Sequence, residues 1–330
     1  MPRRRLCEGG SYATPQMGDE TTRKITFSND WKTRSKIFQR LEKSARNFPT
    51  IGKVARARER SEMELVADTH VHIYPVHDAA GLIRSCADRL RGQAQSPDAV
   101  CALFLTEGKG FHFFDRLRDG SHGLPDAFRV APAAEPEAVR VTWGDQASAW
   151  IFAGRQIVTA ERLEILALTS LDGIPDGAPT GRTVEGVHES GAIPVLSWAP
   201  GKWFFQRGDV VRDVIEGHAP GHLLIGDTAL RPTLWPEPSL MKTARCKGLA
   251  VLAGSDPLPF AGDETQAGGY GVRGDLDFDK NKPVSSVRKW LTDPNAYIER
   301  MGKRNGPVEM LARMMNHRKS KKDEVDERRT

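Results

Sequence analysis

The motif Asp-Thr-His-Val-His at residues 68–72 directly follows the apolar residues 65–67, so we expect it at the carboxyl end of a β-strand. Side chains two residues apart leave the same face of a strand, so His70 and His72 are expected to point together. Two neutral imidazoles can share one cation, and a hydrolytic metal site also needs a carboxylate. Asp256 offers one, because it follows a second short apolar run late in the chain. The two segments predict a metal-dependent hydrolase built on a barrel.

A His-x-His pair is also common without a metal, and two hydrogen-bonded histidines at a strand end are the alternative interpretation. The sequence leaves the role of Asp68 open, since this residue either orients an imidazole or caps a turn. Asp256 precedes a proline, which stiffens a ligand loop but also starts ordinary turns. Metal binding is therefore a hypothesis that depends on whether these residues converge in space.

The length and the charge distribution predict one acidic body with basic ends. A chain of 330 residues can form a single α/β barrel with extensions. Residues 1–66 contain 15 Lys and Arg against 8 Asp and Glu, and residues 299–330 contain 10 against 6, whereas residues 67–298 contain 23 against 29. Charged termini are usually solvated tails, so we expect a small-molecule substrate rather than a nucleic acid. No pattern indicates the oligomeric state.

The cysteine and apolar patterns predict a cytoplasmic protein. The four cysteines show no Cys-x-x-Cys spacing and are too few for a disulfide scaffold in a chain of this length. The arginines at 3–5 are soon followed by Glu-Gly-Gly, where a secretion signal requires an apolar segment. The longest apolar runs, such as residues 99–105, fall far short of the roughly 20 residues that span a bilayer. We therefore expect no membrane segment.

The chain is expected to divide into four parts. These are a basic N-terminal extension (1–63), a βα barrel (64–260), a glycine-rich loop with C-terminal helices (261–317) and a charged tail (318–330). Within the extension, residues 31–46 show the periodicity of an amphipathic helix. We interpret the glycine-rich residues 268–274 as a flexible cover and the tail as mobile.

Between residues 64 and 260, strand-like apolar runs alternate with helical segments. Strands are predicted at 65–73, 99–106, 193–197, 222–226 and 249–253, and helices at 78–95, 183–190, 209–216 and 238–247. Short β-like segments separated by turn residues occupy 128–168, which predicts a small antiparallel β insertion. The alternation predicts an α/β fold with a parallel sheet, in the form of an irregular TIM-type βα barrel, although it does not by itself distinguish a closed sheet from an open one.

In a barrel the carboxyl ends of the strands converge on one face, so acids at these ends are candidates for the site. Glu107 and Asp227 each follow a predicted strand. Glu164 enters a strand at a position where a buried carboxylate needs a partner, so it faces water, a cation or a metal. Trp198 and Lys202 belong to an aromatic segment that suits an anionic or ring-bearing substrate, or that simply packs on the barrel rim.

The order of motifs over residues 64–260 resembles that of the PHP family of metal-dependent hydrolases and phosphoesterases, and more distantly that of the amidohydrolases. In PHP-like sequences an opening Asp-x-His-x-His is followed by Thr-Asp-His, Gly-x-Glu, a histidine on a strand, His-Pro-Gly and a closing Gly-Ser-Asp-x-His. This chain has the opening motif at 68–72 and Gly-Ser-Asp at 254–256. It differs in Thr-Glu-Gly at 106–108, Gly-Arg-Gln at 154–156, Glu164 for the histidine, Trp-Ala-Pro-Gly at 198–201 and Pro-Leu at 257–258.

The resemblance implies a metal-lined barrel, and the differences imply a reduced set of ligands rather than a trinuclear site. The expected ligands of one divalent ion, Zn²⁺ or Mn²⁺, are His70, His72 and Asp256, with Glu107 or Glu164 as a further ligand and an open position for water. The expected catalytic residues are Asp256, Glu164 and Asp227, and the expected substrate-binding residues are Lys202, Trp198 and Gln156.

Two functions follow from these patterns. The first is a single-metal hydrolase of PHP or amidohydrolase type that acts on a phosphate ester or a cyclic amide, with a carboxylate that accepts a proton from bound water. The second is a catalytically inactive PHP-like protein that binds a ligand in its pocket or a partner through its basic ends. The differences at ligand positions favour the second, and resemblance in fold does not identify the substrate.

Overall fold

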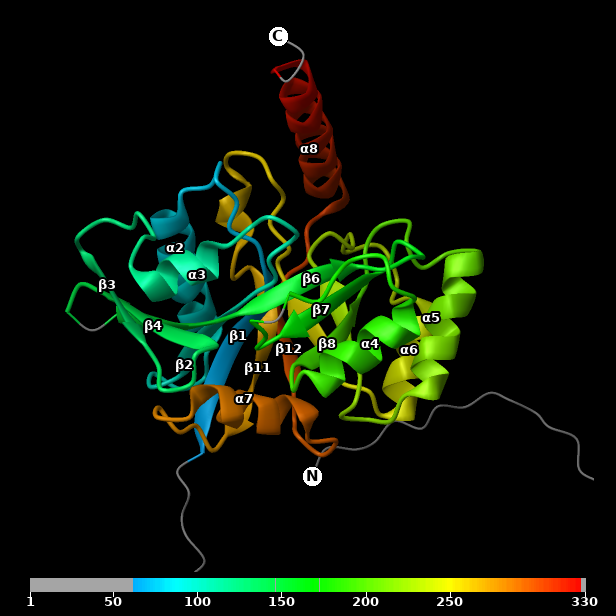
Figure 1. The fold of residues 1–330 in the computed structure, drawn as a ribbon, viewed down its shortest axis with the longest axis horizontal. Coiled ribbons are helices and arrows are strands. Elements are labelled where there is room, and N and C mark those ends of the chain that lie inside the picture. Colours follow the sequence, from blue (N-terminus) through cyan, green and yellow to red (C-terminus); the bar gives the residue numbers. More distant parts are fainter. Residues whose placement is uncertain (1–61, 146, 172, 328–330) are drawn as a thin grey trace, which may run out of the picture. The chain divides into compact units, whose positions relative to one another are not determined.

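Residues 62–145, 147–171 and 173–327 are described by the computed structural model in Figure 1. The chain divides into two units, 1–61 and 62–330, and every described residue belongs to the second. The helix predicted at 31–46 therefore lies outside the described residues. None of the helices in the described ranges combines the length and the apolar character needed to cross a membrane.

A seven-stranded mixed sheet contains the first strand of the fold, and its order is β12-β11-β1-β2-β5-β4-β3. The strands are β1 (Met63–Val71), β2 (Val100–Leu105), β3 (Phe128–Pro132), β4 (Ala138–Trp143), β5 (Ala147–Phe152), β11 (Tyr270–Leu276) and β12 (Glu299–Gly302). β1 pairs in parallel with β2 and antiparallel with β11. Residues 65–67 of β1 are fully buried, as expected for an apolar run covered on both faces of a sheet.

A five-stranded sheet has the order β10-β9-β8-β7-β6. Its strands are β6 (Gly154–Val158), β7 (Glu164–Leu168), β8 (Ile193–Ser197), β9 (Leu224–Thr228) and β10 (Val251–Gly254). β8, β9 and β10 run parallel, while β7 is antiparallel to both β6 and β8. The first residue of β7, Glu164, consequently pairs with Ser197 at the carboxyl end of β8. This reversal brings the start of β7 to the edge of the sheet where the parallel strands end.

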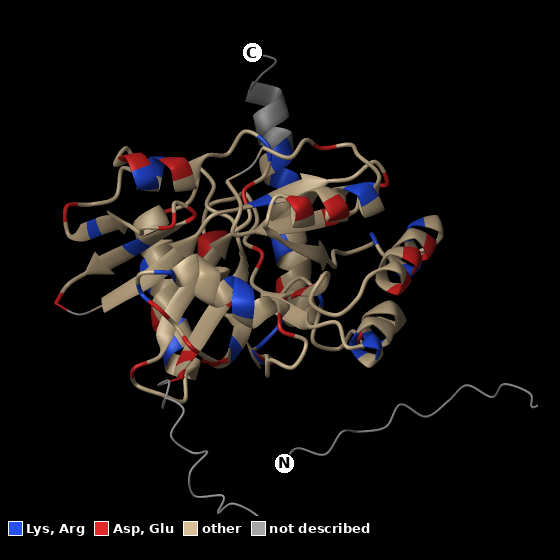
Figure 2. Cartoon of the chain, turned by 60° about the horizontal axis from the view of Figure 1, so that its bottom comes forward, with Lys and Arg blue, Asp and Glu red and all other residues tan. Residues whose placement is uncertain are grey.

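Most helices cover the outer faces of the sheets, whereas α7 packs against strands of both sheets and α8 forms the C-terminal end. They are α2 (Ala79–Gln93), α3 (Phe113–Asp119), α4 (Thr180–Glu189), α5 (Gln206–Gly217), α6 (Ser239–Lys247), α7 (Pro283–Thr292) and α8 (Pro307–Glu327), with a short 3-10 helix, η2, at Asp263–Gln266. The α2 helix begins after Asp78, whose carboxylate accepts a hydrogen bond from the backbone of Gly81 at 3.0 Å. Charged residues lie mostly on helices and loops, and the strands are mostly uncharged (Figure 2).

Three buried apolar clusters hold the layers together. The central cluster joins the two sheets to each other and to α7, and includes Leu65, Phe104, Leu166, Val195 and Leu252. A second cluster packs α2 and α3 against the outer face of the seven-stranded sheet, and a third packs α4, α5 and α6 against the five-stranded sheet. Successive side chains of a strand point to opposite faces of the sheet. The central strands β1, β2, β8 and β9 are buried at nearly every position, so both faces of each sheet are covered there.

The predicted α/β class is confirmed, but the described strands form two sheets rather than a closed TIM-type barrel. Besides the central apolar cluster, backbone contacts between strand ends join the two sheets. A single parallel bridge joins Glu107, after β2, to Arg155 of β6, and the backbone of Asp256, after β10, donates to His70 O at 2.9 Å. These local contacts bring strand ends together, but they do not form a continuous ladder of backbone hydrogen bonds from one sheet to the other. The alternation of strands and helices in the sequence does not predict whether such a ladder forms.

The β-rich segment 128–168 is not a separate insertion, because β3 to β5 extend the first sheet while β6 and β7 extend the second. The interpretation of 268–274 as a flexible cover was wrong, since β11 lies between β1 and β12. A Cβ at Gly271 would overlap the backbone of Ala67, so glycine here permits close pairing and not mobility. The charged tail predicted from residue 318 is helical through Glu327.

Gly254, the last residue of β10, lies directly against β1. A Cβ at this position would overlap both the Cβ and the backbone nitrogen of His70. Neither group can move without shifting β1, so the two strand ends approach this closely only because residue 254 has no side chain.

We predict that Gly254→Ala lowers the free energy of unfolding by about 2 kcal/mol, because the added methyl group has no space. Gly186→Ala in α4 is the matched control, since an added Cβ there meets no atom within 4 Å. Alanine in a helix should raise stability by about 0.5–1 kcal/mol. Urea denaturation of both variants measures the difference, and equal stabilities would contradict the close approach of β10 to β1.

Candidate metal centre

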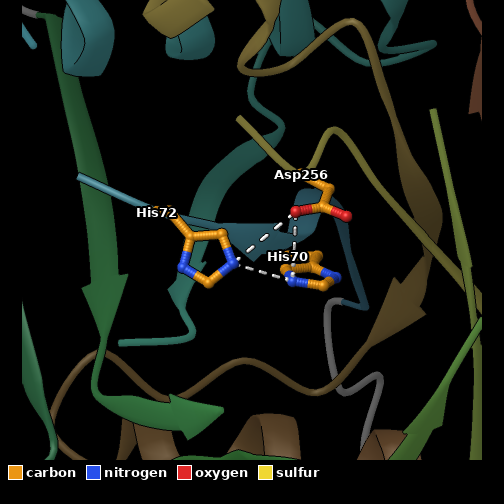
Figure 3. Close-up of side chains that lie close together, drawn as sticks. All are labelled: His70, His72 and Asp256. Carbon is orange, nitrogen blue, oxygen red and sulfur yellow. Dashed lines mark hydrogen bonds and ion pairs between the residues drawn. The ribbon is translucent and has the colours of Figure 1, made fainter. Parts of the chain in front are cut away.

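His70 and His72 at the end of β1 supply two imidazoles that face each other (Figure 3). Their Nε2 atoms are 3.0 Å apart and their ring centroids 4.9 Å apart, at an interplanar angle of 63°. The two residues are 2% and 4% exposed. The spacing of two residues therefore brings both rings to one side of the chain, as the sequence predicts.

Asp256 reaches the two histidines from the loop after β10. Its Oδ1 atom lies 3.6 Å from Nε2 of His70 and 3.6 Å from Nε2 of His72 (Figure 3). The residue has a φ of 51°, a left-handed conformation that is uncommon outside glycine and that persists only where surrounding contacts hold it. The predicted convergence of the first strand and a distant acid is present.

The donor atoms have a spacing that suits a small divalent cation. An ion with tetrahedral ligands at roughly 2.0–2.1 Å separates its donor atoms by roughly 3.3–3.4 Å. The observed separations run from 3.0 to 3.6 Å. Within the described part of the chain, His70, His72 and Asp256 form a group of potential ligands whose donor atoms all lie within 4.8 Å of one another.

The protonation states also fit a metal. Burial lowers the pKa of His70 to about 4 and that of His72 to about 3, so both rings are neutral at pH 7 and have a lone pair for a cation. Burial raises the pKa of Asp256, and the positive charge of Arg313 opposes this shift. A cation at the shared position would favour the ionised carboxylate in the same way.

Asp68 does not contact an imidazole, although it belongs to the same motif. The register of β1 against β2 shifts between Asp68 and Val71, as at a β-bulge, which redirects side chains. The fully buried carboxylate accepts four hydrogen bonds, from the backbone of His70, Ser255 and Gly268 and from the Ser255 hydroxyl, at 2.5–3.2 Å. Asp68 therefore joins the strand of the histidines to the loop of Asp256.

Arg313 on α8 holds the loop of Asp256 from the opposite side. Its Nη2 atom donates to the backbone carbonyl of Asp256 at 2.9 Å, and its guanidinium pairs with both carboxylate oxygens of Asp263 at 2.6–2.7 Å. Nη1 donates to the side chain of Asn305 at 2.7 Å. Arg313 is 4% exposed, so this network is fixed inside the protein. The sequence analysis missed Arg313, because the sequence of a charged helix does not indicate which of its basic side chains is buried.

Of the other predicted residues, Gln156 contacts a histidine, and Glu164 and Lys202 form an ion pair. The side-chain oxygen of Gln156 is 3.2 Å from Nε2 of His70, which is within hydrogen-bond distance of the nitrogen that would bind the ion. Glu164 is paired with Lys202 at 2.5 Å, and its charge raises the pKa of His70 against the effect of burial. Glu164, which was expected to need a partner, therefore has one in Lys202. The charges of this pair act on His70 and Asp256.

Tyr74 is a neighbour of the site that the sequence analysis did not identify. Its ring stacks on His72 with centroids 5.3 Å apart, and it meets Phe111 edge to face at 5.0 Å. Burial raises the pKa of its hydroxyl, and the charges of Asp256 and Glu164 raise it further. The signal was present, because Tyr74 continues the spacing of two residues that relates His70 to His72.

Glu107 does not join the candidate ligands. Its carboxylate accepts hydrogen bonds from the backbone of Phe113 and Phe114 at 2.5 and 3.1 Å, at the amino end of α3. Burial raises its pKa to about 7. The carboxylate of Glu107 therefore accepts from backbone N–H groups that have no partner within α3. The sequence analysis did not predict a helix at this position.

Asp227 and Trp198 also lie in settings that differ from the predicted ones. Asp227 forms a buried ion pair with Arg231 and also accepts from Tyr270 and Arg300, so its carboxylate belongs to a saturated polar cluster. Trp198 is 1% exposed and packs in the apolar cluster under the five-stranded sheet. A buried core position does not suit substrate contact.

No family model and no curated protein matches the chain, but several solved structures do. PsfC from Pseudomonas syringae is 17% identical with a TM-score of 0.50, over 78% of this chain and 99% of that protein. A two-domain protein from Bacteroides vulgatus, containing a predicted PHP-like metal-dependent phosphoesterase, is 12% identical with a TM-score of 0.40, over 72% and 64%. The lesion-specific endonuclease PfuEndoQ from Pyrococcus furiosus is 11% identical with a TM-score of 0.41, over 73% and 59%.

At these identities the similarity concerns the fold and does not extend to activity. This chain spans nearly all of PsfC but less than two thirds of the other two proteins.

Proposed function

We propose that the protein is a metal-dependent hydrolase that binds one divalent ion, Zn²⁺ or Mn²⁺, through His70, His72 and Asp256. The observation that carries this proposal is the convergence of three donor atoms, from segments more than 180 residues apart, at separations of 3.0–3.6 Å. Neutral imidazoles and a carboxylate are ligands that both ions accept. Three protein ligands leave room for water or substrate, as hydrolytic sites require.

The surrounding residues can carry out the remaining steps of a hydrolysis. A divalent ion in such a site supplies Lewis acidity and makes water a better nucleophile. Glu164 is a carboxylate whose charge acts on His70 and that is outside the ligand group, so we assign it the role of proton acceptor. Lys202 holds Glu164 in place and adds positive charge near Asp256, which favours an anionic substrate. This charge favours a phosphate ester over a cyclic amide.

We predict that protein purified without chelator contains about one equivalent of Zn or Mn, and that His70→Ala/His72→Ala abolishes this content. The matched control is His188→Ala/His222→Ala, a second pair of stacked histidines with centroids 4.7 Å apart that lies outside the candidate ligand group. Elemental analysis by mass spectrometry measures the metal. A wild-type protein without metal that also fails to bind added Zn²⁺ or Mn²⁺ would exclude the proposed site.

We predict that Glu164→Gln retains the metal and lowers kcat about 100-fold or more, because the proton acceptor is lost. Hydrolysis of phosphate monoesters and of a cyclic amide such as dihydrouracil is measured on the metal-loaded protein. A metal-loaded wild type that turns over neither class would favour the alternative, a catalytically inactive ligand-binding protein.

We predict that Arg313→Met weakens metal binding about tenfold or more, because the loop of Asp256 loses its fixed position. Competition with a chelator dye measures the affinity. Arg313→Lys should restore part of the loss, and Arg318→Met, which removes an exposed arginine from the same helix, should have no effect. An unchanged affinity in a folded Arg313→Met protein would show that the ligand loop does not depend on α8.

A further inference from the structure

A cavity of about 720 Å³ lies next to the candidate metal centre. One side is aromatic and is formed by Tyr74, Phe111 and Phe260, and the other is formed by Asn316, Lys319 and Ser320 of α8. Its volume is within the range of small-molecule sites in proteins, roughly 300–1,000 Å³. The remaining lining residues are prolines, a valine and an alanine, so Lys319 is the cation among the residues that line it.

Two connections relate this cavity to the metal ligands. Tyr74 lines the cavity and stacks on His72, so one ring separates the cavity from a candidate ligand. The wall that contains Phe260 begins three residues after Asp256, in the loop held by Arg313. Asn316 follows Arg313 by three residues on α8, so the helix that fixes the ligand loop presents polar groups to the cavity from a neighbouring position.

The chemistry of the walls selects a class of ligand. Aromatic side chains stack on planar rings, and each such contact favours binding of the ring. The positive charge of Lys319 favours a negatively charged ligand, and the hydroxyl of Ser320 and the amide of Asn316 can accept or donate hydrogen bonds. A small anion without a ring would leave the aromatic wall uncovered, and a neutral ring would gain nothing from the positive charge of the lysine.

We propose that this cavity binds the ring of the substrate, and that the substrate is a small anion with a planar ring, an aryl or similar phosphate monoester. The inference rests on the proposed hydrolase function, because it places the ring in the cavity and the ester beyond Tyr74, toward His72. Phe260 then selects the ring, and the positive charge of Lys319 attracts the anion without pairing with the ester, so the two residues determine specificity without taking part in the chemical step.

Calorimetric titration of the full chain with phenyl phosphate and with methyl phosphate tests the role of the ring. Phenyl phosphate should bind at least tenfold more tightly, and Phe260→Ala should remove most of this preference. Phe260→Leu, which keeps an apolar side chain of similar size, should also lose the preference and provides the test if the alanine variant does not fold. Tyr297→Ala, which removes an exposed ring outside this cavity, is the control and should retain it.

Lys319→Gln tests the role of the charge. It should weaken both phosphate esters severalfold and leave the binding of neutral phenol unchanged, whereas Lys321→Gln, two residues further along α8 and outside the lining, should change neither. Equal affinities of the wild type for phenyl and methyl phosphate, or a preference that survives in both Phe260 variants, would overturn the proposal.

The proposed ring-binding cavity and the proposed hydrolase function can be tested separately. Removal of metal with a chelator should leave the preference for the ring intact, because no wall residue is a candidate ligand. Preferential binding of phenyl phosphate without turnover of either ester would support the cavity and contradict the hydrolase. Turnover of both esters with the same kcat/KM in wild type and Phe260→Ala would support the hydrolase and contradict the cavity.

Discussion

The buried carboxylate of Asp68 is the interaction on which the arrangement of the site depends. It collects donors from three segments, namely the end of β1, the loop at Ser255 and the turn at Gly268, the last of which is 200 residues away in sequence. A carboxylate without partners would be costly to bury, so the four hydrogen bonds must form together as the segments meet. This requirement fixes the end of β1 against the loop of Asp256, and it does so without using either imidazole.

Local patterns in the sequence predicted much of the fold. The strand at 193–197 has the predicted bounds, and the helices around 79–93 and 239–247 agree with the predictions to within two residues. These segments show strong apolar periodicity, which reflects the burial of one helical face or of a central strand. The histidine pair was predictable for the same reason, because the spacing of two residues in an extended chain is a local property. Asp256 was found by its position after a buried strand.

The features that sequence analysis missed depend on contacts between distant segments. Whether sheets close depends on single bridges such as Glu107 to Arg155, and β11 was missed because its glycines, which allow close pairing with β1, are also typical of loops. Glu107 was correctly placed after a strand, whereas Asp227 lies within β9 and not after it. The partners of Glu107 come from a helix start, and those of Asp227 are Arg231, four residues later, and the distant Arg300. Acidic residues near strand ends are therefore candidate site residues, and only those whose carboxylates are not already paired with other groups can bind a metal or a substrate.

The clamp of Arg313 on the loop of Asp256 has a consequence for the order in which the protein matures. Two of the three donor atoms come from the first described strand, and the residue that steadies the third comes from the last described helix. Domains generally begin to fold from the amino end while the chain is being synthesised, so the sheets have most of their strands before α8 is available. If the proposed site binds an ion, tight retention would require α8, so a chain that ends before residue 313 would have both histidines and would bind the ion more weakly.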